Sequence, residues 1–257
     1  CTLTSTLGAE LMPQSNPLQN VYNMGNVNKG GSTMVRVFFV FLCLMLLSAS
    51  AGSEKNVNPD INRHYEDADA ARWRGVFERE GREVWDQRNE IIRHLRLQPG
   101  QTAADIGAGS GFFTLLMAQQ VGPTGRVYAV DITENFVGAI VHRAREQELS
   151  NVVGVVNTQH SAQLPVNSID LAFISDTYHH FEYPRSMLRS IHSALKPGGH
   201  MVIIDFRRAP ESSSSWVLGH VRADVRQVIK EVQASGFEVT EELDFMQTQY
   251  YLRFRKK

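Results

Sequence analysis

Short apolar runs alternate with stretches of helical periodicity over most of the chain beyond residue 100. Such runs, bounded by turn residues, predict buried strands, and apolar residues three and four apart predict amphipathic helices. The expected strands cover residues 102–106, 126–131, 152–156, 169–175 and 200–206, and the expected helices cover 111–120, 133–147 and 185–195. This alternation predicts an α/β fold built from βαβ units, with a parallel sheet and helices on both faces.

The last part of the chain has a different order of elements. A helix is expected near residues 221–235 and ends at Gly236, and strands follow near residues 237–243 and 248–255. Because little lies between these two strands, they predict an antiparallel hairpin at the edge of the sheet.

A helical lead-in, residues 52–100, is expected to precede the main domain of residues 101–257. Its first residues, 53–69, are polar and predict a loose connection. Apolar residues then recur at helical spacing from Ala70 to Leu95, and Gly81 is expected to separate two helices. Further along, the Lys-Pro-Gly-Gly segment at 196–199 predicts a turn before the fifth strand.

The first part of the chain is typical of a leader rather than of a folded domain. Residues 1–33 are rich in Asn, Ser, Thr and Gly and predict a disordered or read-through leader. Residues 34–51 combine a basic start at Arg36, the apolar run Val37 to Leu47 and a small-residue ending. This pattern predicts a signal peptide that begins at Met34 and an exported protein, periplasmic or secreted. A membrane anchor is the alternative, although a full span needs about 20 apolar residues.

Composition and charge exclude several classes of protein. The formal net charge is −1, with 26 basic and 27 acidic residues, so nothing predicts a nucleic-acid partner. The two cysteines, Cys1 and Cys43, cannot form a disulfide framework or a cysteine-based zinc site. Membrane contact is expected only if the leader is retained.

The most informative segment is a glycine-rich loop between the first predicted strand and the helix after it. Its sequence is Asp-Ile-Gly-Ala-Gly-Ser-Gly at 105–111, and Asp131 ends the second strand about 20 residues later. Glycines allow a tight turn and close approach of a ligand, and an acid at that place usually binds ribose hydroxyls. Phe112 stands where a dinucleotide motif needs its third glycine, and Asp105 would repel a pyrophosphate. The loop therefore favours a cationic amino-acid nucleoside over NAD.

The ordered set of motifs resembles the class I S-adenosylmethionine-dependent methyltransferases, over about Glu83 to Arg255. The matching motifs are the loop at 105–111, V-Y-A-V-D at 127–131, D-L-A-F-I-S-D-T-Y-H-H-F at 170–181 and L-K-P-G-G at 195–199. The resemblance implies a Rossmann-like, seven-stranded, mostly parallel sheet with an antiparallel C-terminal hairpin, and S-adenosylmethionine as cofactor.

The resemblance also implies which residues bind the cofactor. The methionine part would lie against Gly107, Ala108, Gly109 and Gly111, with its amino group near Asp105. Asp131 would hold the ribose, and Ile132 would lie against the adenine. The family often has an Asp that contacts the adenine amine, but residues 159–165 here are Q-H-S-A-Q-L-P. Adenine recognition is therefore expected to fall to His160, Ser161 or the backbone.

Candidate catalytic residues follow the fourth predicted strand, where its carboxyl end faces the ligand crevice of such sheets. Asp176 is expected to orient the acceptor, and His179 or His180 to remove its proton. The alternative is that the histidine pair only packs locally. A metal site would pool these three residues with His160, but no ligand spacing supports one, so none is predicted.

Together these features predict methyl transfer to a small-molecule or lipid-like acceptor. The transfer is an in-line displacement, so positioning of the two reactants can supply most of the catalysis. Two alternatives stay open from the sequence. One is a non-catalytic S-adenosylmethionine- or nucleoside-binding protein, and the other, disfavoured by Phe112, is an NAD-dependent oxidoreductase.

Overall fold

A computed structural model describes residues 53–65 and 67–257 of the chain. The predicted leader, 1–33, and the predicted signal peptide, 34–51, lie outside the described residues. Within the described part, no helix is both long enough and apolar enough to cross a membrane.

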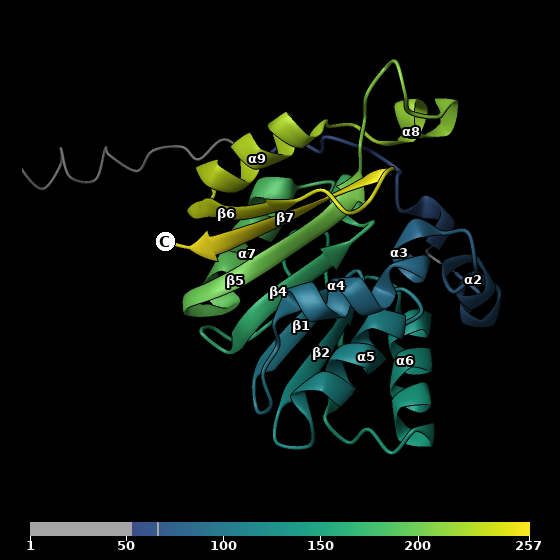
Figure 1. Ribbon diagram of the computed structural model, residues 1–257, viewed down its shortest axis with the longest axis vertical. Coiled ribbons are helices and arrows are strands. Elements are labelled where there is room, and N and C mark those ends of the chain that lie inside the picture. Colours follow the sequence, from purple (N-terminus) through teal and green to yellow (C-terminus); the bar gives the residue numbers. More distant parts are fainter. Residues whose placement is uncertain (1–52, 66) are drawn as a thin grey trace, which may run out of the picture. The chain divides into compact units, whose positions relative to one another are not determined.

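The core of the molecule is a seven-stranded sheet in the order β3-β2-β1-β4-β5-β7-β6 (Figure 1). The strands are β1 Thr102–Ile106, β2 Arg126–Asp131, β3 Val152–Val156, β4 Ile169–Ser175, β5 Leu195–Phe206, β6 Phe237–Leu243 and β7 Gln249–Lys256. The first five strands pair in parallel, and β7 is antiparallel to both β5 and β6. The predicted mostly parallel sheet with an antiparallel C-terminal hairpin is confirmed.

Helices cover both faces of this sheet, with α4 and α5 in front of it and α7 behind it in Figure 1. The helices are η1 Arg63–Tyr65, α2 Ala70–Phe77, α3 Glu83–Asp86, α4 Arg88–Leu95, α5 Phe112–Val121, α6 Glu134–Glu146, η2 Tyr178–His180, α7 Pro184–Ala194, α8 Ser215–His220 and α9 Val225–Ala234. Alternate residues of the central strands enter opposite cores. Phe173 packs with α4 and α5, whereas its neighbours Ala172 and Ile174 pack with α7 and α9. This period of two is what buries the central strands on both faces.

The structure differs from the sequence predictions in the lead-in. The polar residues 53–69 are not a loose connection, since Glu54 accepts hydrogen bonds from the backbone N–H groups of Arg185 and Ser186 at 2.7 and 2.8 Å. Helices α2, α3 and α4 form where two helices were expected, because the chain turns again at Gln87.

The expected turn at 196–199 is also wrong. These residues belong to β5, which pairs with β4 through Ile169 and Leu195 and again through Leu171 and His200. The register shifts between these pairs, and Gly198 has a φ of +73°. The segment is therefore a bulge inside a strand, because pairing continues on both sides of it.

Candidate active site

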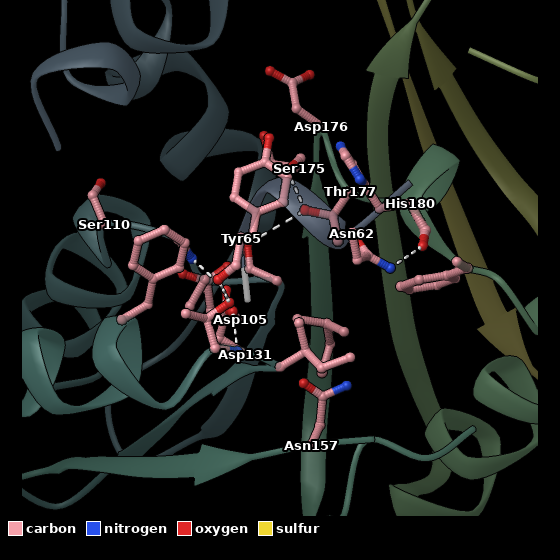
Figure 2. A pocket seen from close by; sticks show the side chains of 18 of the residues that line it. Asn62, Tyr65, Asp105, Ser110, Asp131, Asn157, Ser175, Asp176, Thr177 and His180 are labelled. Carbon is pink, nitrogen blue, oxygen red and sulfur yellow. Dashed lines mark hydrogen bonds between the residues drawn. The ribbon is translucent and has the colours of Figure 1, made fainter. Parts of the chain in front are cut away.

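A cavity of about 970 Å³, including its open mouth, lies at the carboxyl ends of β1, β2 and β4 (Figure 2). The chain leaves β1 toward β2 on one side and later places β4 on the other side. The cavity therefore lies where the strand order reverses, which is where open α/β sheets bind their ligands.

The glycine-rich loop forms one wall of the cavity. Gly107 has a φ of +74°, and a Cβ atom there would lie 2.2 Å from Cγ2 of Thr177. Glycine is required here because the loop packs directly against the residues that follow β4. Ala108 and Gly109 line the cavity beside it. Gly111 is not part of the lining but precedes α5 and faces Ile140.

Two buried carboxylates lie beneath this loop. Asp131 accepts hydrogen bonds from the N–H groups of Gly109 at 2.8 Å and Thr133 at 2.9 Å. Asp105 accepts one from the Thr114 hydroxyl at 2.6 Å. Burial raises the pKa of Asp131 and raises that of Asp105 to about 7. Among the described residues no basic side chain pairs with Asp105, so this corner of the cavity is suited to a cation.

A second charged group stands at the end of β4. Asp176 has the left-handed φ of +48°, which aspartate tolerates better than most residues. Its carboxylate forms an ion pair with Arg82 at 2.6 Å and accepts a hydrogen bond from the Gln249 amide. Burial raises the pKa of Asp176, and the Arg82 guanidinium opposes that rise. These contacts hold the carboxylate at the rim, in contact with residues far away in the sequence.

Comparison with known proteins identifies the family. The profile of a methyltransferase domain matches residues 97–252, which is more than half of the chain. The chain belongs to the class I S-adenosylmethionine-dependent methyltransferases. The predicted family and its cofactor are thereby confirmed.

Individual relatives of this methyltransferase are distant. Demethylmenaquinone methyltransferases of Listeria welshimeri and Geobacillus stearothermophilus are 29% and 28% identical over 118 residues, which is 46% of this chain and 50% of each relative. The chain thus spans about half the length of the curated relatives it matches. A methyltransferase from Aquifex aeolicus has a TM-score of 0.64 at 22% identity, over 73% of this chain and 98% of that one. Phosphoethanolamine N-methyltransferase 2 of Haemonchus contortus, solved with S-adenosylmethionine, has a TM-score of 0.59 at 18% identity, over 76% of this chain and 58% of that one. At these identities the two structures show a shared fold.

The cavity of the methyltransferase fits this cofactor in its chemistry. The carboxyl of Asp105, which has no basic partner among the described residues, is suited to an amino group, and Asp131 ends β2 where a ribose is usually bound. Figure 2 shows both side chains on the same side of the cavity. The roles predicted for these residues agree with their positions and stay predictions.

The adenine end differs from the prediction made on the sequence. Ile132 lines the cavity together with Asn157, Thr158 and Gln159. His160 and Ser161 are not among the lining residues, and the ring of His160 packs on Tyr183 at a centroid distance of 3.9 Å. The chain bends through a Thr158–Ser161 bridge, which turns the two residues away from the cavity. Gln159 is thus better placed than His160 to contact an adenine.

The two predicted catalytic histidines occupy different environments. His180 lines the cavity, but burial lowers its pKa to about 2, so its ring is a poor general base. His179 is buried behind the cavity wall, where its Nδ1 lies 2.7 Å from the Asp205 carboxylate. Burial lowers the pKa of His179, but Asp205 overcomes this effect and the net shift is upward.

The lead-in contributes residues that the sequence did not indicate. Asn62, Tyr65 and Phe77 line the cavity together with Arg82. Asn62 donates to the His180 carbonyl at 3.0 Å. Arg143 of α6 ties the end of α2 to the loop by donating to Glu78 at 2.6 Å and to the Ser110 carbonyl at 2.7 Å. Helical periodicity predicts the helix that carries Phe77, but the polar stretch before it has no periodicity that would have singled out Asn62 or Tyr65.

Proposed function

We propose that this protein transfers a methyl group from S-adenosylmethionine to a small, largely apolar acceptor, aromatic or lipid-like. The observation that carries the proposal is the cavity itself, which combines the glycine loop and two acids with an aromatic wall. That wall is made by Tyr65, Phe77, Phe112, Phe113, Phe136 and Phe181. Flat apolar molecules gain most from such surfaces.

The names of the curated relatives support the acceptor class. They are demethylmenaquinone methyltransferases, so their named acceptor is a ring with a lipid tail. The match covers half of their length, and the aromatic wall of this cavity is the feature that extends the proposal to this chain.

Bound S-adenosylmethionine supplies an electrophilic methyl group on its sulfonium. The chain's own part is to hold the two reactants in line and to exclude water, which can supply most of the rate of a direct displacement. Asp105 and Asp131 would fix the cofactor, and the aromatic wall would orient the acceptor. Asp176, held by Arg82, would direct the acceptor's polar group toward the methyl. S-adenosylhomocysteine would leave, and the proton of the methylated acceptor would pass to water, so the reaction needs no strong base, in keeping with the low pKa of His180.

The first experiment is calorimetric titration of the full chain with S-adenosylmethionine. We expect saturable binding that is lost in Asp131→Ala, with folding checked by circular dichroism. Asp244→Ala serves as the matched control, because its side chain is 87% exposed and does not line the cavity. Binding that is absent from the wild type, or equal in Asp131→Ala, would contradict the proposal.

The second experiment measures transfer. Reduced naphthoquinones with and without a prenyl tail, and small phenols, are incubated with the protein and the cofactor, and S-adenosylhomocysteine is measured. We expect turnover with the apolar ring acceptors, and a drop of about 10-fold or more in Asp176→Asn. Cofactor binding without turnover on any acceptor would favour a non-catalytic binding protein.

We also propose that the protein is exported and that the segment 34–51 is its signal. Expression of the full chain with fractionation and N-terminal sequencing tests this. A mature start near residue 52 in an exported fraction is expected. An intact N-terminus in the cytosol would reject the proposal.

A further inference from the structure

Three imidazole rings meet beside the cavity, at a place the methyl-transfer proposal does not use. His179 and His180 come from η2, and His220 is the last residue of α8. A ring nitrogen of each lies within 4.8 Å of the other two. The ring centroids are 4.3 Å apart for His179 and His180, and 5.1 and 5.3 Å from each of these to His220.

The first ring, His179, is oriented by a carboxylate. Its Nδ1 lies 2.7 Å from Oδ1 of Asp205. The other oxygen of Asp205, Oδ2, accepts a hydrogen bond from the backbone N–H of His179 at 3.0 Å. A carboxylate that fixes one ring nitrogen leaves the other to act as a ligand. Carboxylate–histidine–metal arrangements of this kind are the common outer shell of histidine metal sites.

The second ring, His180, has a polar atom without a partner. Its Nδ1 is buried and has no hydrogen-bond partner among the described residues. Buried polar atoms are nearly always paired, so an orphan of this kind points to a group that binds it. Its backbone is fixed, because Asn62 donates to the His180 carbonyl at 3.0 Å.

The third ring, His220, closes the cluster from the solvent side. Trp216 stacks on it with a centroid distance of 4.6 Å and an interplanar angle of 23°. The side of α8 that carries both residues is partly open, with Trp216 54% exposed. An ion in solution can therefore reach the cluster, and Trp216 lies close enough to report its arrival.

We propose that His179, His180 and His220 form a site for a divalent transition-metal ion of the zinc class. Neutral imidazole is a preferred ligand of Zn²⁺, Co²⁺ and Ni²⁺, and three protein nitrogens leave a further coordination position open. The site borders the cavity, because His180 belongs to both. Packing alone does not account for the arrangement, because it leaves a buried ring nitrogen of His180 without a hydrogen-bond partner among the described residues.

The test uses the full chain purified without a histidine tag and stripped of metal. ZnCl₂ is titrated in a calorimeter, and CoCl₂ is titrated with detection of its visible absorption and of tryptophan quenching. We expect one ion per chain, Co²⁺ absorption typical of four- or five-coordination, and quenching of Trp216. His220→Ala should abolish the Co²⁺ bands, whereas His142→Ala should leave them unchanged, because His142 is 73% exposed on α6.

An outer-shell variant separates ligation from loss of packing. Asp205→Asn keeps the size of the side chain but removes the charge behind His179, and such changes typically weaken metal affinity about 10–100-fold. Equal metal binding by the wild type and His220→Ala would overturn the proposal. So would a wild type that binds neither Zn²⁺ nor Co²⁺ at a saturable site. All titrations omit S-adenosylmethionine, so their failure leaves the proposed methyl transfer untouched.

Discussion

Asp105 lowers the stability of the folded protein and at the same time provides a carboxyl group suited to bind a ligand's amino group. Its carboxyl is buried beside Asp131, and its pKa rises from 3.8 to about 7. Because the folded-state pKa is raised, the acid form is favoured by folding, and stability is lost as pH rises from 3.8 through about 7. The free protein therefore bears a cost at neutral pH that a bound amino group would offset.

Asp105→Asn is expected to stabilise the cofactor-free protein by ~1–4 kcal/mol at pH 8, because the amide has no charge to desolvate. The gain should be smaller at pH 5, where the wild-type carboxyl is largely protonated in the folded protein. Urea unfolding at both pH values checks this. An equal gain at the two pH values would show that the carboxyl is not held out of water.

Gly107 carries a steric prediction at the same scale. Gly107→Ala should destabilise the protein by about 1–3 kcal/mol more than Gly122→Ala. Both glycines have positive φ, at +74° and +67°, but only the Cβ at 107 would meet Thr177, while the space at 122 is open. Thermal unfolding measures the stability lost in each variant. Equal losses would mean that the cost comes from the positive φ alone and not from the contact with Thr177.

At the scale of elements, α2 is held over the cavity mainly by contacts at its carboxyl end. It buries none of its residues fully, and its Glu78 end is held by Arg143 of α6. The helix itself starts well, since Asp69 caps the N–H groups of Ala71 and Arg72. We therefore expect the docking of α2 over the cavity to be lost more easily than its helical structure.

Arg143→Ala is expected to release α2 while the sheet stays intact, because Glu78 then loses its buried partner. Hydrogen exchange in residues 70–77 should rise by an order of magnitude or more, and exchange in β4 should not change. Arg74→Ala is the control, because that arginine is 55% exposed and its pair with Glu78 contributes little. Slow exchange of α2 in Arg143→Ala would place its anchor elsewhere.

The order of elements was predictable because strands buried on both faces leave a strong signal. Phe173 and Ile174 are fully buried neighbours, and a strand buries two successive residues in this way when helices cover both faces of its sheet. The docking of residues 53–69 on the main domain was missed, because these residues are polar and are placed by hydrogen bonds to distant segments. The His220 ring was missed for the same reason, since 40 residues separate it from His180 and only the fold brings them together.

On the scale of the whole molecule, the central strands hold the two cores together. Phe173→Ala should cost about 3–5 kcal/mol in the free energy of unfolding, because it removes a fully buried ring that packs on Phe113 at 4.9 Å. Val166→Ala, at a residue 68% exposed, should stay within about 0.5 kcal/mol. Guanidinium unfolding measures both, and a loss below 1 kcal/mol for Phe173→Ala would mean the core closes over the gap.

The contact between Glu54 and α7 has a practical consequence for trimming or fusing the chain. Glu54 accepts hydrogen bonds from two backbone N–H groups and the Ser186 hydroxyl at the start of that helix. A shortened version that starts after residue 54 would leave the first turn of α7 uncapped, although that helix lies far from residue 54 in the sequence. Any protease site or fusion junction is therefore best placed before Ser53.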